Sequence, residues 1–170
     1  MNQIGSIRRL DELGRIVIPK EIRNSLRIKP GDNFEIYLNG NDIILKKHSP
    51  LESFKELSHS IVQTLFTKIK KDILIVSGET IIENTDKNIK EKQISDELYN
   101  LISSRQATLF HSKKIYLTET YLINKDLIIS PINVAGDILG ALIITGEDLT
   151  EETKNIAEIL TTVLIKELEN

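Results

Sequence analysis

The sequence predicts an α+β protein of two small domains, a strand-rich N-terminal domain and a larger one that combines an antiparallel sheet with helices. Three observations favour this class. Short runs of β-forming residues separated by Gly, Pro and Asn fill residues 6–47. A capped helical pattern then starts at Ser49, and strands and helices follow until a long amphipathic C-terminal pattern. We set the domains at residues 1–50 and 51–170.

The first part of the N-terminal domain predicts a strand pair followed by a short helix. The segments SIRRL (6–10) and RIVI (15–18) have the composition of strands, and Gly14 suits the turn between them because glycine adopts positive φ at little cost. Pro19 fits the first position of a helix over residues 20–26.

A second strand pair completes this domain. NFEIYL (33–38) and DIILKK (42–47) predict a hairpin, with Asn39 and Gly40 suited to the positive φ angles of a tight turn. Four strands and one short helix are too little chain for a good core, so the sequence predicts that this domain oligomerises.

The C-terminal domain begins with a long helix whose start is marked by Ser49, Pro50 and Glu52 and which runs to about Lys70. After it we expect strands over 72–77 and 80–83, a polar loop over 84–92, a helix over 95–105, strands over 108–111, 114–120, 127–134 and 137–145, and a helix over 150–167. The last two strands are almost continuously apolar, which predicts burial on both faces.

The two long helices carry apolar stripes that repeat at the helical period. In the last helix the stripe consists of Ile156, Ile159, Leu160, Val163, Leu164 and Leu168. We expect the two helices to pack side by side and to form a bundle across a dimer axis.

Charge is distributed unevenly between the two halves. The whole chain has a net charge of −3, but residues 1–47 carry nine basic and six acidic side chains, a balance of +3, which leaves −6 for the remainder. This asymmetry favours nucleic acid as a partner of the N-terminal domain, although a solvated charged surface explains it as well.

Composition argues against several other classes of function. The chain has no cysteine, and His48, His59 and His111 do not have the spacing of metal ligands, so we expect no metal site, no resident cofactor and no enzyme activity. No apolar run is long enough to cross a bilayer and no signal peptide is recognisable, which predicts a cytoplasmic protein with no membrane partner. Binding to nucleic acid would make it nucleoid-associated.

The stretch GSIRRLDELGRIVIPKEIRNSLRIKPGDNFEIYLNGNDIILKK, residues 5–47, closely resembles the AbrB family of bacterial transition-state regulators, and the resemblance covers residues 4–47. The resemblance implies a swapped-hairpin β-barrel in which two chains interleave their strands, and therefore an obligate homodimer. Residues 51–170, with the PINVAGDILGALII hairpin, resemble the GAF domain that follows the AbrB-like domain in some members. A GAF domain implies an α/β sandwich around an antiparallel sheet, and its pairing would join dimers into a tetramer.

The same resemblance implies a sequence-specific regulator that binds double-stranded DNA, controlling sporulation genes of the forespore. It implies DNA contacts at Arg8, Arg15 and Arg23. To these we add their neighbours Arg9 and Lys20, together with Asn24, as expected DNA-binding residues. Arginine forks bind phosphate or guanine bidentately. Asn24 stands where many relatives have a basic residue, so we expect it to contact adenine or phosphate. The alternative is that the arginines pair with Asp11, Glu12 or Glu21 on a solvated surface, which fits Arg27 best.

The C-terminal domain has two interpretations that the sequence leaves open. It is either a sensor, with a small-molecule pocket enclosed by the sheet, the helix at 96–103 and the loop at 84–92, or a dimerisation module with a filled core. For the whole chain, the alternative function is that of an antitoxin, which binds DNA through the same barrel and neutralises a toxin.

Overall fold

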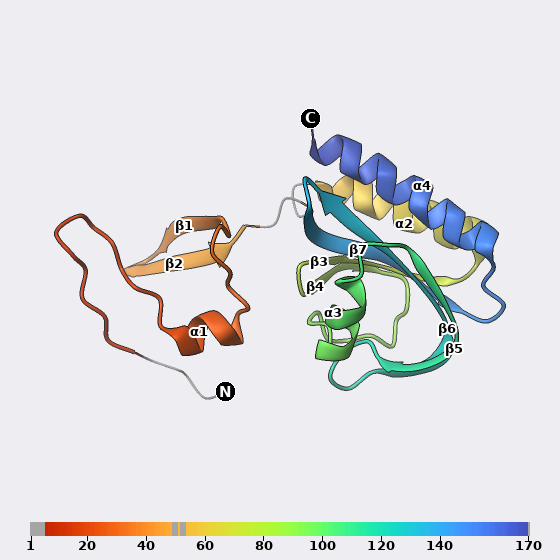
Figure 1. The fold of residues 1–170 in the computed structure, drawn as a ribbon, viewed down its shortest axis with the longest axis horizontal. Coiled ribbons are helices and arrows are strands. Elements are labelled where there is room, and N and C mark those ends of the chain that lie inside the picture. The colour runs from red at the N-terminus through yellow and green to blue at the C-terminus, as the bar shows by residue number, and fades with distance from the viewer. Residues whose placement is uncertain (1–5, 49–50, 52–53, 170) are drawn as a thin grey trace. The chain divides into compact units, whose positions relative to one another are not determined.

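The computed structural model describes residues 6–48, 51 and 54–169, and the chain divides into two compact units (Figure 1). We call residues 1–48 the N-terminal unit and residues 49–170 the C-terminal unit. Each unit has its own sheet, of two strands in the first and five in the second.

The hairpin of the N-terminal unit is confirmed. Strand β1 (Phe34–Asn39) pairs antiparallel with β2 (Asp42–Lys47), and Asn39 lies opposite Asp42. The two-residue turn therefore consists of Gly40, with a φ of 61°, and Asn41. Asn39 itself is the last residue of β1, so of the two residues predicted for the positive φ region only Gly40 occupies it.

The short helix α1 (Lys20–Ser25) is also confirmed, but Pro19 precedes it instead of being its first residue. The φ of Pro19, −56°, suits a helix, whereas its ψ of 148° is extended. The chain therefore enters α1 from an extended segment, and helical backbone begins at Lys20.

The two strands predicted at 6–10 and 15–18 are wrong for the single chain. Both segments lack ladder partners, and the bonds that join them belong to the turn, from Asp11 N to Arg15 O (3.1 Å) and from Gly14 N to Asp11 O (3.0 Å). A strand requires a neighbour that supplies backbone donors and acceptors. Within the described residues of this chain, no other segment lies in that position.

The C-terminal unit contains the predicted antiparallel sheet, in the order β4-β3-β7-β6-β5. Its strands are β3 (Asp72–Ser77), β4 (Thr80–Asn84), β5 (Thr108–Tyr116), β6 (Leu122–Val134) and β7 (Asp137–Gly146). The central strands β6 and β7 form a hairpin through Ala135 and Gly136, whose φ angles of 51° and 94° match a tight two-residue turn. Residues 127–132 and 140–146 are buried, as their apolar runs predict.

Strand β5 corrects the prediction of two separate strands over 108–111 and 114–120. It is continuous through a bulge at Ser112, where φ is 47°, and it ends at Tyr116. The Ser112 amide, which the bulge withdraws from the ladder, donates to Asp126 Oδ1 at 2.9 Å. This bond to the neighbouring strand lets one extended element continue past a residue that local sequence marks as a break.

Helices cover both faces of the sheet (Figure 1). Helices α2 (Lys55–Ile69) and α4 (Glu151–Leu168) lie on one face, and α3 (Asp96–Ile102) lies on the other. Thr150 and Ser95 cap α4 and α3 by accepting amide hydrogen bonds. Helix α2 begins at Lys55, later than predicted, and the cap expected from Ser49, Pro50 and Glu52 lies outside the described residues.

Each face of the sheet has its own apolar core. The α3 side includes Leu74, Leu98 and Leu127, and the α2/α4 side includes Val62, Ile144 and Leu164. In the part of the chain that the structure describes, no helix is long and apolar enough to span a bilayer.

Candidate nucleic-acid interface

The turn formed by residues 10–15, which we call the 10–15 turn, is built around Asp11. Asp11 Oδ1 accepts hydrogen bonds from the amides of Leu13 (3.0 Å) and Arg15 (2.7 Å). Gly14 has a φ of 75°, which closes the turn at a position where other residues would be strained. The turn therefore holds the backbone of Arg15 by hydrogen bonds to the side chain of Asp11.

The side chain of Arg15 is also bound to Asp11. Arg15 Nε lies 2.7 Å from Asp11 Oδ2, and the Arg15 side chain is 74% exposed. The amide of Arg15, followed by its guanidinium, lowers the pKa of Asp11 below its ordinary value. The pairing expected as the alternative to DNA binding is thus present, although it engages only the Nε end of the guanidinium.

Helix α1 supplies the second group of predicted DNA-binding residues. Arg23 donates from Nη1 to Ile18 O at 2.6 Å, which ties its exposed side chain to the segment that leads into the helix. Lys20 and Asn24 are exposed on the same short helix. Their proximity follows from helical spacing, because residues three and four apart lie on one face.

The remaining predicted residues, Arg8 and Arg9, are exposed in the extended segment before the 10–15 turn. Arg8 Nη1 donates to the neighbouring Ile7 O at 3.3 Å. Arg27 differs from all of these, because it is half-buried and follows α1 with a φ of 46°. All six predicted DNA-binding residues are therefore accessible on this unit, whereas Arg27 is less so.

Apolar side chains are exposed throughout the N-terminal unit. Among residues 6–48, Pro19 alone is buried. The exposed large apolar residues are Ile7, Leu10, Leu13, Ile16, Val17, Leu26, Ile36, Tyr37, Leu38, Ile43 and Leu45. An exposed apolar surface on this scale is the mark of an interface, since a chain that folded alone would bury these side chains.

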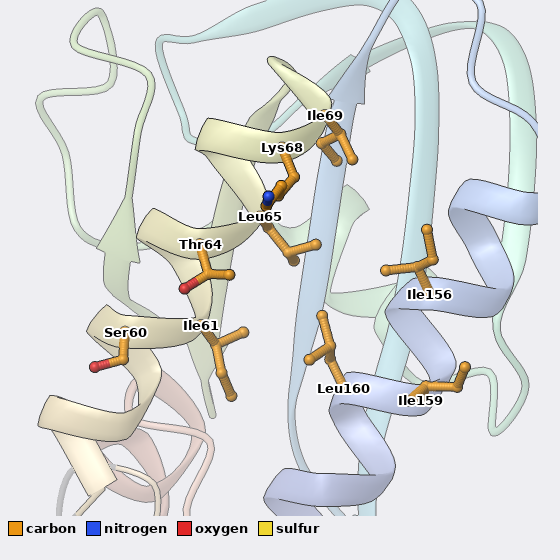
Figure 2. Close-up of a pocket in the computed structure, with 9 residues that line it drawn as sticks. All are labelled: Ser60, Ile61, Thr64, Leu65, Lys68, Ile69, Ile156, Ile159 and Leu160. Carbon is orange, nitrogen blue, oxygen red and sulfur yellow. The ribbon is translucent and has the colours of Figure 1, made fainter.

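The C-terminal unit has an apolar groove of about 530 Å³ between α2 and α4 (Figure 2). Ile61 and Leu65 from α2 face Ile156 and Leu160 from α4 across it, and Lys68 lies at its edge. The expectation that these helices pack side by side is therefore corrected, because both pack on the sheet and leave the groove between them.

The apolar stripe predicted on α4 divides into two faces. Leu164 is fully buried against the sheet, together with Ala157 and Thr161, which the stripe did not include. Ile159 and Val163 are 64% and 42% exposed. Hydrophobic period alone could not separate the two faces, since a small or hydroxylated residue on the buried face does not register as apolar.

The pocket expected between the sheet, α3 and the 84–92 loop is largely filled by side chains. Ile89 and Ile94 are buried in the core on this side, beside Leu98. A smaller, more polar pocket of about 300 Å³ lies between β4 and the 89–92 segment. Among the described residues, no group of three or more His, Asp or Glu side chains is arranged to hold a metal ion.

The 84–92 loop is fastened to the turn before β6. The Tyr121 hydroxyl donates to Asp86 Oδ2 at 2.6 Å, and Thr120 Oγ1 donates to Glu91 Oε1 at 2.9 Å. Asp86 is only 7% exposed and also accepts from the amide of Asn88 at 2.9 Å. The bond to Asp86 raises the pKa of Tyr121 to about 12. These fastening residues were missed in the sequence, where nothing links positions so far apart.

Comparison with known proteins divides the chain at residue 53, close to the boundary between the N-terminal and C-terminal units. Residues 7–53 match the family model described as antidote-toxin recognition MazE, bacterial antitoxin, and residues 53–169 match the model described as stage V sporulation protein T C-terminal, transcription factor. The chain is 33% identical over 158 residues to the Stage V sporulation protein T of Bacillus subtilis (strain 168), which covers 88% of each chain.

Two further relatives each match 50 residues of this chain, which is 29% of its length, at 50% identity. They are the putative transition state regulator Abh and the transition state regulatory protein AbrB, both from Bacillus subtilis (strain 168), covered over 54% and 52% of their lengths. The AbrB resemblance predicted from residues 4–47 is thus confirmed.

Solved structures show the fold alone. A type II free methionine-R-sulfoxide reductase from Thermoplasma acidophilum aligns with a TM-score of 0.57 at 12% identity, covering 71% of this chain and 95% of its own. A methyl-accepting chemotaxis protein, residues 122 to 287, aligns with a TM-score of 0.51 at 12% identity, covering 68% and 88%. The GAF domain of the nutrient sensor CodY from Clostridium difficile aligns at 0.49 and 16% identity, covering 69% and 96%.

Proposed function

The chain belongs to the stage V sporulation protein T family, and we propose that it is a regulator of sporulation genes that binds duplex DNA through its N-terminal unit. The observation that carries the proposal is the set of exposed arginines on and beside the 10–15 turn and α1, in a unit 50% identical to two transition state regulators. The basic excess of residues 1–47 supports the same ligand.

In this proposal Arg8, Arg15 and Arg23 bind the duplex most directly, from both chains of a dimer. Guanidinium forks bind phosphate oxygens or the O6 and N7 atoms of guanine bidentately. Arg9 and Lys20 bind phosphates beside them, and Asn24 reads adenine or donates to phosphate. These assignments come from the resemblance, and the exposure of all six side chains supports them.

We infer that two N-terminal units interleave as a swapped-hairpin barrel. A second copy would provide ladder partners for residues 6–10 and 15–18 and would cover the exposed apolar surface that includes Val17 and Ile36. Because a unit with Pro19 as its one buried residue among 6–48 has no core of its own, the dimer is the folded species.

The C-terminal units pair in turn through the faces of α2 and α4 that border the groove, giving a tetramer. Exposed Ile159 and Val163 support this assignment, since they continue the groove's apolar surface. Ile159→Glu should reduce the mass measured by light scattering, whereas Gln63→Glu, a change at an exposed position of α2 that does not line the groove, should leave it unchanged. Equal masses for the two variants would refute this interface.

The C-terminal unit is proposed to be a GAF-like domain that modulates DNA binding. Its antiparallel sheet with helices on both faces supports the fold. The pocket of about 300 Å³ that includes Lys90, Lys92 and Glu83 supports a small polar ligand. A native mass spectrum of protein from cell extract tests whether a ligand is bound. A sensor would retain one, whereas a scaffold with a filled core would retain none.

An antitoxin role is the second candidate, supported by the match of residues 7–53 to an antitoxin model. The match ends where the C-terminal unit begins, and residues 53–169 match a transcription factor instead. Purification from the native host distinguishes the two functions, because an antitoxin copurifies with a small toxin.

DNA binding is tested by selecting duplexes from a random-sequence library with the full chain and measuring their affinity for variants. Arg15→Ala should weaken binding by about 1–3 kcal/mol for each bidentate arginine–base pairing that it removes, counted twice per dimer. Arg27→Ala should change the affinity little. A library with no enriched duplex, or an Arg15→Ala protein that binds the selected duplex normally, would refute the proposal.

A further inference from the structure

Asp11 is hydrogen-bonded to Arg15 through three of its polar groups. Its Oδ1 accepts from the amide of Arg15, its Oδ2 accepts from Nε, and its own amide donates to Arg15 O. The two distances from the carboxylate are both 2.7 Å, within the range of charge-assisted hydrogen bonds. One residue therefore fixes both the backbone and the guanidinium of Arg15.

The bond at Nε has a geometric consequence for the rest of the side chain. Nε is the guanidinium nitrogen next to the aliphatic stem, so its bond to Asp11 orients the plane of the group without using the pair of η nitrogens at the tip. These two nitrogens form the fork that binds phosphate or guanine bidentately. The Arg15 side chain is 74% exposed, which leaves room for a ligand.

We propose that Asp11 is a positioning residue for DNA recognition, which holds the fork of Arg15 in a fixed direction and so favours sequence-specific binding over general attraction to phosphate. This inference rests on the proposed function of Arg15. A fixed fork loses less conformational freedom when it meets one particular base edge. The carboxylate also brings a negative charge close to DNA, which weakens sequence-independent binding.

A purely structural role for Asp11 predicts different behaviour, and one substitution separates the two. In Asp11→Asn the amide oxygen can still accept from the amides of Leu13 and Arg15, so the turn remains. Its NH₂ group, however, cannot accept a hydrogen bond from Arg15 Nε. The variant therefore loses the bond that orients the guanidinium of Arg15 and retains the hydrogen bonds that hold the 10–15 turn.

Glu12→Gln is the matched control. Glu12 is exposed in the same turn, and its substitution changes the charge of each chain by the same amount as Asp11→Asn. Both variants should bind an unrelated duplex as well as or better than wild type, because each dimer has two fewer negative charges. Any difference between them then reports on the bond to Arg15.

The experiment measures the affinity of wild type, Asp11→Asn, Glu12→Gln and Arg15→Ala for a library-selected duplex and for an unrelated duplex of equal length. For Asp11→Asn we expect the ratio of the two affinities to fall about tenfold, within the range for one weakened bidentate pairing. For Glu12→Gln the affinities for both duplexes should shift together, leaving the ratio near that of wild type. In the free protein, the Nε–H of Arg15 should exchange slowly by NMR in wild type and Glu12→Gln, and rapidly in Asp11→Asn.

Equal ratios for Asp11→Asn and Glu12→Gln, with normal weakening by Arg15→Ala, would overturn this inference alone. If Arg15→Ala binds both duplexes as wild type does, the proposed function of Arg15 fails instead. Should Asp11→Asn not fold, Asp11→Ser replaces it, because its hydroxyl caps the turn without carrying the charge. The same fall in ratio is then expected, and an unchanged ratio overturns the inference.

Discussion

The bond between Tyr121 and Asp86 gives a sharp test of how the C-terminal unit is held together. The carboxylate of Asp86 is 7% exposed and accepts from the Tyr121 hydroxyl at 2.6 Å and from Asn88. Tyr121→Phe removes one hydrogen bond to a buried charged group, which contributes about 1.5–3 kcal/mol. For a unit of this size we expect the melting temperature to fall by roughly 5–15 °C.

Tyr116→Phe is the control for this substitution. Tyr116 is 46% exposed, so loss of its hydroxyl should change stability by less than about 0.5 kcal/mol. Calorimetry of the full chain measures both variants. Equal melting temperatures for the two variants would refute the view that this bond fastens the 84–92 loop.

The pH dependence of the same bond has a definite sign. The pKa of Tyr121 is raised to about 12 from an ordinary value of 10.0, so its stabilisation is complete below pH 10 and is lost as pH rises through about 12. Absorbance titration should therefore show one tyrosine that ionises near pH 12. The same titration of Tyr121→Phe should lack this transition, and a Tyr121 phenol that ionises at its ordinary pKa in the folded protein would contradict the hydrogen bond.

Three further predictions concern the C-terminal unit. Leu164→Ala should cost about 2–5 kcal/mol in denaturant unfolding, because the side chain is fully buried against the sheet; a loss below about 1 kcal/mol would contradict its burial. Gly140→Ala should destabilise by about 3 kcal/mol or more, since a Cβ at this position would overlap Val76 O; normal stability would show that β3 and β7 can separate. The pKa of Asp126 is lowered, first by the amide of Ser112, so its stabilisation is present above an ordinary pKa of 3.8 and disappears as pH falls through the lower folded value. The melting temperature of Asp126→Asn should therefore fall less than that of wild type when the pH is lowered from about 5 to about 2.

Much of the C-terminal fold could be predicted because its signals are local. The apolar runs of β6 and β7 and the helical period of α4 belong to single elements, and the structure contains each of them. The bulge at Ser112 could not be predicted in this way, because it depends on Asp126 in the next strand. The groove between α2 and α4 depends on how two helices share one sheet face, which periodicity does not specify.

The N-terminal unit was harder to predict for a different reason. Segments 6–10 and 15–18 have strand-forming composition, but their partners are not supplied by the same chain. For the site, the resemblance indicated Arg15, and the sequence offered Asp11 as an alternative partner. The structure contains that pair in a form that leaves the η nitrogens at the exposed tip, a detail set by the turn geometry and not by residue spacing.

The salt dependence of DNA binding tests the proposed function most directly. A dimer that presents Arg8, Arg15 and Arg23 twice, with neighbouring lysines, would bind about six to ten phosphates or base edges, and its affinity for a selected duplex should fall about 10³–10⁵-fold between about 50 and 200 mM salt. An affinity that changes less than about tenfold over this range would contradict binding through these basic side chains.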